Sequence, residues 1–117
     1  MFTSRAPVGT VAIAMNEICT NQGFKSVIPK NNIGTAFVYS FLKENKQLIE
    51  SHASGTTFME VSGSVMKNIP AIIPKPGLAK QFTALCTPLF EVQRQNELEI
   101  YKLQDIKQTI ISSFSSR

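Results

Sequence analysis

The sequence predicts an α+β fold, with a head over residues 1–76 and a long helix over residues 77–117. Short apolar segments rich in β-branched residues indicate a small antiparallel or mixed sheet in the head. Apolar residues at helical spacing between Ile33 and Ser51 indicate a helix packed on that sheet. From Leu78 onward the sequence has no glycine and repeats large aliphatic residues at intervals of three and four, which predicts a coiled-coil-type helix.

The head begins with two candidate strands. Residues 8–15 (VGTVAIAM) are largely apolar, and residues 24–28 (FKSVI) alternate roughly between apolar and polar side chains. The helix expected to follow carries Phe41 on its apolar face, and we expect this ring to anchor the core. The head is therefore predicted to be a short meander covered by one amphipathic helix.

Two further segments connect this helix to the long one. Residues 62–68 are expected to form a short helix, because Ser62 is a good residue to cap its first turn. Residues 68–77 (NIPAIIPKPG) contain three prolines, which force an extended path and a stiff connection.

The last segment, residues 77–117, is expected to act as a spacer and dimerisation helix. A helix with one long apolar stripe buries that stripe only against another helix, so we expect a homo-oligomer. The polar seam residue Asn96 would fix the register and orientation of the two helices. The alternative is a helix folded back on its own head. The predicted helix-pairing interface consists of Leu85, Leu89, Val92, Asn96, Leu103, Ile106 and Ile110.

Composition narrows the function. The chain is 43% hydrophobic and 17% charged, which is typical of a folded protein, and its net charge of +4 is compatible with a polyanionic partner. Cys19 and Cys86 fit no metal spacing, and His52 is the single histidine, so we expect no metal site and no catalytic residues. No apolar run approaches membrane-spanning length, and the expected location is the cytoplasm.

Three polar segments of the head carry side chains that suit double-stranded DNA. Asparagine and glutamine pair with adenine edges, arginine and lysine bind guanine or phosphate, and hydroxyl groups bind phosphate. The structural alternative is that these are ordinary turn and helix-stop residues. The candidate DNA contacts are Ser4, Arg5, Thr20, Asn21, Gln22, Lys25, Ser54, Thr56 and Thr57.

The order of several segments resembles a known family. Four segments, taken in order, resemble the C-terminal half of a target recognition domain from the DNA-specificity subunit of type I restriction–modification systems. These segments are SRAPVGTVAIA, CTNQGFKSVIP, FVYSFLKENKQLIES and SGTTFMEVSGSVMKNIPAIIPKP. The spacer helix that follows such a domain resembles PLFEVQRQNELEIYKLQDI. The TNQGFK and SGTTFMEVS motifs are the most specific parts of this resemblance.

The resemblance implies a function without catalysis. Such subunits carry two recognition domains, each of which reads one half of a split DNA site, and two antiparallel helices set the spacing. They position methyltransferase and endonuclease subunits on DNA. The methyltransferase subunit uses S-adenosylmethionine, so the specificity subunit itself needs no cofactor. The resemblance covers only part of a recognition domain, so we expect the chain to be a fragment of such a subunit.

Two other functions stay open. The chain could be a non-catalytic, dimerising protein–protein interaction module, or a silent remnant that no longer reads DNA. A small enzyme is disfavoured because the catalytic groups it would need are missing. DNA binding that depends on salt and on sequence would favour a fragment of a DNA-specificity subunit over these alternatives.

Overall fold

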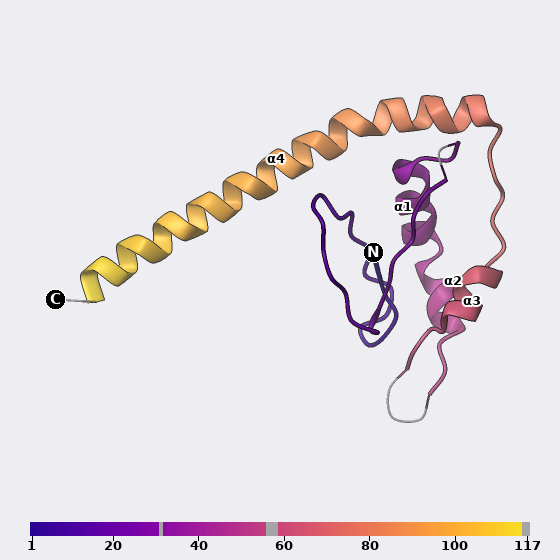
Figure 1. Ribbon diagram of the computed structural model, residues 1–117, viewed down its shortest axis with the longest axis horizontal. Coiled ribbons are helices and arrows are strands. Elements are labelled where there is room, and N and C mark those ends of the chain that lie inside the picture. The colour runs from indigo at the N-terminus through magenta and orange to yellow at the C-terminus, as the bar shows by residue number, and fades with distance from the viewer. Residues whose placement is uncertain (31, 56–58, 116–117) are drawn as a thin grey trace. The chain divides into compact units, whose positions relative to one another are not determined.

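The computed structural model describes residues 1–30, 32–55 and 59–115. The chain divides into two units, Met1–Thr83 and Ala84–Arg117, which are considered separately. The two short strands and four helices of the described residues confirm the predicted α+β class (Figure 1). They are β1 (Phe2–Thr3), β2 (Phe24–Lys25), α1 (Thr35–Glu44), α2 (Lys46–Ser51), α3 (Gly63–Asn68) and α4 (Pro76–Ser115).

The sheet of the first unit is an antiparallel pair. Phe2 of β1 lies opposite Lys25 of β2, and Thr3 lies opposite Phe24. The second strand was expected to run over residues 24–28, but regular pairing ends at Lys25. The residues beyond that point keep a β-rich composition, but they are exposed and do not continue the paired strand.

The prediction of a strand over residues 8–15 was wrong. Only Val11 makes a ladder contact, an isolated antiparallel bridge to Phe2. A tight loop precedes it, in which the Gly9 N–H donates to the carbonyl oxygen of Thr3 at 3.0 Å while Gly9 has a φ of +91°. A positive φ turns the backbone away from the extended path, so the segment contributes packing without regular pairing.

The helix predicted between Ile33 and Ser51 is present but interrupted. Helices α1 and α2 meet at Asn45, whose Nδ2 donates to the Phe41 carbonyl oxygen at 2.8 Å. An asparagine side chain that binds a backbone carbonyl in this way competes with the regular helical ladder. The expected anchor Phe41 is only partly buried, and Leu42 and Ile49 are the residues that α1 and α2 bury in the core.

The core of the first unit is small and draws on distant parts of the chain. Phe2, Ile49 and Val61 have no exposed surface at all. Residues of α1, α3 and the neighbouring loops pack around them. A core of this size makes each large side chain important for stability. The buried cluster is Phe2, Val8, Leu42, Ile49 and Val61, and the partly buried residues against it are Val11, Val38, Phe41, Ala53, Val65, Met66 and Ile69.

The short helix α3 has the cap that the sequence predicts. The Ser62 hydroxyl oxygen accepts a hydrogen bond from the Val65 N–H at 3.2 Å. This bond satisfies one of the backbone donors that the first turn of a helix leaves unpaired. The predicted helix over residues 62–68 is thus confirmed, including its capping residue.

The approach to α1 is packed tightly against the first turns of α4. Gly34 has a φ of +82°, and a Cβ atom at this position would lie 2.5 Å from the Thr83 Oγ1. Both the backbone conformation and the lack of space call for glycine here. The contact joins two segments of the first unit that are far apart in the sequence.

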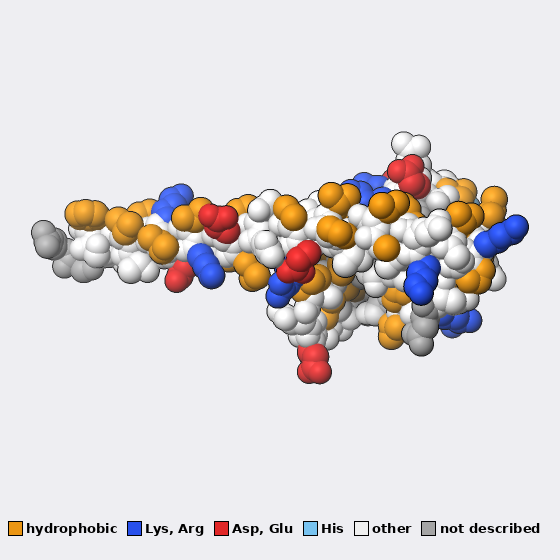
Figure 2. All heavy atoms as spheres, turned by 90° about the horizontal axis from the view of Figure 1, so that it is seen from above, with side chains coloured by type: hydrophobic (Ala, Val, Ile, Leu, Met, Phe, Trp, Pro, Cys, Tyr) orange, Lys and Arg blue, Asp and Glu red, His pale blue; other side chains and the backbone are white. Residues whose placement is uncertain are grey.

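The second unit consists of the remaining part of α4, which continues through Pro88. Its large aliphatic side chains are exposed: Leu85 at 75%, Leu89 at 65% and Ile106 at 55%. Figure 2 shows hydrophobic side chains recurring along this segment among charged ones. In the part of the chain that the structure describes, no helix combines the length and the apolar character needed to cross a membrane.

Candidate nucleic-acid interface

The three polar segments that the sequence analysis singled out meet in the first unit. The Ser4 N–H donates to the Gly23 carbonyl oxygen at 2.8 Å, and the Ser4 carbonyl oxygen accepts from the Val61 N–H at 2.8 Å. Ser54 and Glu60 exchange two backbone hydrogen bonds, both of 3.0 Å. Main-chain bonds therefore bring residues 4–5, 20–25, 54–55 and 59–61 side by side.

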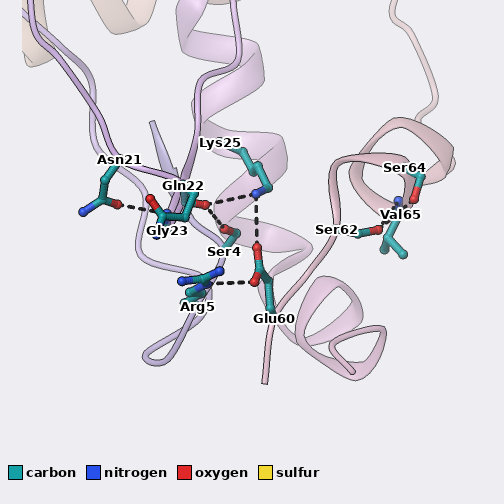
Figure 3. A network of polar contacts seen from close by, with 10 residues as sticks. All are labelled: Ser4, Arg5, Asn21, Gln22, Gly23, Lys25, Glu60, Ser62, Ser64 and Val65. Atoms are coloured by element: carbon teal, nitrogen blue, oxygen red, sulfur yellow. Dashed lines mark hydrogen bonds and ion pairs between the residues drawn. The ribbon is translucent and has the colours of Figure 1, made fainter. Parts of the chain in front are cut away.

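A carboxylate joins the basic side chains of these segments. The Arg5 Nε donates to the Glu60 Oε2 at 2.7 Å, and the Lys25 Nζ lies 3.4 Å from the Glu60 Oε1 (Figure 3). Lys25 also donates to the Gln22 carbonyl oxygen at 3.2 Å. We call Arg5, Lys25 and Glu60 the charged cluster. Two cations and one anion leave it a net charge of +1, which suits a polyanion.

The charged form of Glu60 is favoured by its partners. The hydrogen bond from Arg5 is the largest influence and lowers the pKa of the carboxyl group. Partial removal of water opposes this shift, and the hydrogen bond from Lys25 adds to it. Glu60 therefore stays ionised at neutral and mildly acidic pH, and the cluster keeps its ion pairs there.

Two of the predicted contact residues are engaged in shaping the loops. Ser4 is completely buried, and its hydroxyl lies 3.5 Å from the Gln22 carbonyl oxygen. Its side chain has no exposed surface for a ligand and instead packs where the segments join. The Asn21 Oδ1 accepts from the Gly23 N–H at 2.9 Å, which closes a turn of the type that asparagine favours. The Asn21 side chain is exposed beyond this bond.

The other predicted contacts differ in accessibility. Thr20, Gln22 and Ser54 are exposed residues of the same loops. Arg5 is about half exposed and Lys25 is less so. The structure therefore brings accessible polar groups from all three segments to one region. The predicted contacts Thr56 and Thr57 lie outside the described residues.

Sequence reasoning missed Glu60, which links the predicted segments. Its bonded side chains are 55 and 35 residues away along the chain, so no local pattern marks it. The one available signal was an acidic residue three positions after the candidate contact Thr57. His52, by contrast, lies at the end of α2, where its Nδ1 is 2.7 Å from the Leu48 carbonyl oxygen.

Comparison with known proteins gives the family. Residues 1–108 match the family described as "Type I restriction modification DNA specificity domain". The chain is 38% identical over 78 residues to the type I restriction enzyme MjaIX specificity subunit of Methanocaldococcus jannaschii. These 78 residues are 65% of this chain and 18% of the relative. It is 27% identical over 109 residues to the type I restriction enzyme HindI specificity subunit of Haemophilus influenzae, covering 91% of this chain and 24% of that protein.

A further relative, the putative type I restriction enzyme MjaX specificity subunit of M. jannaschii, is 27% identical over 107 residues and is covered to 25% of its length. The chain thus spans between 18% and 25% of the length of these three relatives. No solved structure matches it. The match extends over most of the sequence and confirms the resemblance read from the motifs: the chain belongs to the family of type I restriction modification DNA specificity domains.

Proposed function

We propose that this chain contributes to sequence-specific recognition of double-stranded DNA as part of a type I specificity subunit. One observation carries the proposal: in a chain of this family, three polar segments meet at a charged cluster with a net positive charge. Loops that are held on a rigid frame and display polar side chains are a common way to build a binding surface.

The polar groups in and around the cluster divide into two kinds. Lys25, and the hydroxyl groups of Thr20 and Ser54, suit phosphate, because such contacts fix the register of a protein on the duplex. Asn21 and Gln22 carry amide groups that can make paired hydrogen bonds with adenine in the major groove. The proposed surface thus combines contacts that position the protein with contacts that read bases.

The DNA proposal is tested with the full chain and a pool of duplexes of randomised sequence. Selection should enrich a common sequence, and the affinity for it should fall as salt increases because bound phosphates release counterions. A combined Arg5→Ala and Lys25→Ala variant should bind more weakly and with a shallower salt dependence. Lys67→Ala with Lys80→Ala is the control, since these exposed lysines lie outside the cluster. Equal effects of the two double variants would contradict the proposed surface.

The same family membership supports a proposal about partners. We infer that the subunit to which this domain belongs positions methyltransferase and endonuclease subunits on DNA, and that methylation is performed by a partner that binds S-adenosylmethionine. The domain would then need neither catalytic residues nor a cofactor of its own. Reconstitution with a methyltransferase subunit should give DNA methylation that requires this chain, whereas the chain alone should give none.

The exposed stripe of the second unit supports pairing of α4. We propose that it packs antiparallel against the same helix of a second copy, or against a sister helix in a longer subunit. At about 25 cal/mol per Å² of buried apolar surface, covering six large aliphatic residues releases several kcal/mol. Those residues are exposed by half or more of their surface, and Asn96 lies within their register.

Pairing of α4 is tested by sedimentation at several concentrations. Leu103→Asp with Ile106→Asp should give a monomer, because charges would be placed on the stripe. Gln104→Asp with Gln108→Asp adds the same two charges away from the stripe and should leave association unchanged. If the unmodified chain sediments as a monomer at high micromolar concentration, self-pairing is refuted.

The second candidate function is an interaction module that uses this stripe and no longer reads DNA. The observation in its favour is that the stripe of α4 is exposed and contains no residue of the charged cluster. It predicts concentration-dependent association together with DNA binding that has no sequence preference. The selection experiment therefore decides between the two functions.

A further inference from the structure

We propose that Arg5 reads a guanine base in the major groove and that Glu60 is the positioning residue that aims it. This inference rests on the proposed DNA-binding function and deepens it, because it assigns one side chain to one base. Three features of the structure lead to it: the fixed backbone on either side of Arg5, the single nitrogen through which Arg5 binds Glu60, and the pairing of Glu60 with Lys25.

The backbone at Arg5 is held on both sides. The preceding residue, Ser4, is buried and hydrogen-bonded to Gly23 and Val61 through its main chain. Arg5 itself forms an antiparallel bridge with Glu60. A side chain that reads a base must start from a well-defined position, because an error of about 1 Å weakens a directional contact. The position of the Arg5 Cα meets this requirement.

The guanidinium group of Arg5 uses only part of its hydrogen-bonding capacity. Its Nε donates to the Glu60 Oε2 at 2.7 Å, and no hydrogen bond of its terminal nitrogens is seen among the described residues. The guanidinium is planar and rigid, so a hydrogen bond at the Nε limits the orientations open to the two terminal nitrogens. With 47% of the side chain exposed, this fork is accessible from solvent. Figure 3 shows Arg5 beside Glu60, with a dashed line marking the bond between them.

An arginine fork fits guanine well. The O6 and N7 atoms of guanine are two acceptors side by side in the major groove, and arginine binds them with two parallel hydrogen bonds. Phosphate is the other ligand that matches the fork. Glu60 lies closer to Arg5, at 2.7 Å, than to Lys25, at 3.4 Å, and so offsets the charge of Arg5 more strongly. This difference favours the neutral acceptors of guanine at Arg5 and leaves phosphate to Lys25.

Lys25 completes the arrangement. Its Nζ lies 3.4 Å from the second carboxylate oxygen of Glu60 and also donates to the Gln22 carbonyl oxygen. Both oxygens of Glu60 are thus engaged, so the carboxylate is held in place from two sides. Glu60 orients Arg5 by charge and geometry, and Lys25 holds Glu60 from the other side.

The test uses the full chain and a duplex selected from a randomised pool. Each guanine of the duplex is replaced in turn by 7-deazaguanine, which lacks the N7 acceptor and leaves the phosphates unchanged. The unmodified chain should lose affinity at one particular guanine by about 5- to 150-fold, the discrimination expected of one bidentate contact. Arg5→Lys keeps the charge but lacks the fork. This variant should show the same salt dependence as the unmodified chain on all duplexes, and it should become insensitive to that replacement.

Glu60→Gln separates positioning from a purely structural role. This variant should keep its melting temperature within a few degrees and keep or raise its affinity for unrelated DNA, yet lose sensitivity to 7-deazaguanine at the same position. Lys67→Ala, outside the cluster, should retain full sensitivity. A structural role alone would instead lower the melting temperature and the affinity for every duplex together.

The outcomes also separate this inference from the proposed function. If selection enriches a sequence and no 7-deazaguanine replacement weakens binding, the guanine assignment is refuted and DNA recognition stands. If Arg5→Lys lowers the affinity for all duplexes equally, Arg5 is a phosphate contact. If selection enriches no sequence at all, the proposed function and the guanine assignment both fail.

Discussion

Replacing Ile49 with alanine should destabilise the first unit severely. Ile49 lies on α2, has no exposed surface and packs in the cluster with Phe2, Leu42 and Val61. The change removes three carbon atoms from a buried side chain. At about 0.8 kcal/mol for each buried methylene group, the lost burial amounts to about 2.4 kcal/mol. A residual cavity adds to this value, so the expected loss is about 3–4 kcal/mol.

That loss is large compared with the stability available. At about 0.05–0.15 kcal/mol for each residue, a unit of the size of Met1–Thr83 is stable by only about 4–12 kcal/mol. Urea denaturation followed by circular dichroism measures the change. With a slope of about 1–2 kcal/mol per molar urea, the midpoint should fall by about 1.5–4 M, or the head should already be unfolded without urea.

A neighbouring residue provides the matched control. Leu48 precedes Ile49 on the same helix but is 40% exposed, so Leu48→Ala removes a similar side chain from a partly solvated position. Its effect should stay below about 1.5 kcal/mol. Equal midpoint shifts for Leu48→Ala and Ile49→Ala would refute the described core. A loss below about 1 kcal/mol for Ile49→Ala would do the same.

Three other predictions concern local features. Ser62→Ala removes the cap of α3 and should cost about 1 kcal/mol in the same denaturation assay, while Ser62→Asp should preserve most of the stability. Gly34→Ala should lower the melting temperature of the first unit by several degrees, because the residue has a positive φ and its new Cβ would collide with Thr83. The lowered pKa of Glu60 predicts that its ion pairs stabilise the fold above the usual carboxyl value of 4.5 and that this contribution is lost as pH falls through the folded pKa. The stability of Glu60→Gln should accordingly depend less on pH in the acidic range, and an unchanged acid profile would show that the pair with Arg5 contributes nothing.

Local signals were read correctly where a few neighbouring residues decide the structure. Ser62 caps α3 because its hydroxyl reaches the backbone of its own first turn, and the apolar spacing of residues 33–51 gave the helical segment. The break at Asn45 was missed, because asparagine inside a helix pattern does not reveal whether its side chain will bind a carbonyl group.

Structure that depends on distant residues was harder to predict. Residues 8–15 have the composition of a strand, but the turn at Gly9 and the lack of a long partner strand leave only one bridge. The candidate contact segments were found by side-chain chemistry and family resemblance. Their junction at Glu60 depends on pairs of residues separated by 35 and 55 positions, for which a single sequence offers no pattern.

The way in which the three loops are joined has an evolutionary consequence. Main-chain atoms form the bonds between Ser4 and Gly23, between Ser4 and Val61, and between Ser54 and Glu60. Such bonds do not depend on which side chains the loops carry, except where proline would remove a donor. Exposed loop residues can therefore be exchanged with little effect on the frame. Under the proposed function, a scaffold of this kind allows new target sequences to arise by single substitutions, so that the preference of the domain can diverge rapidly while its fold persists.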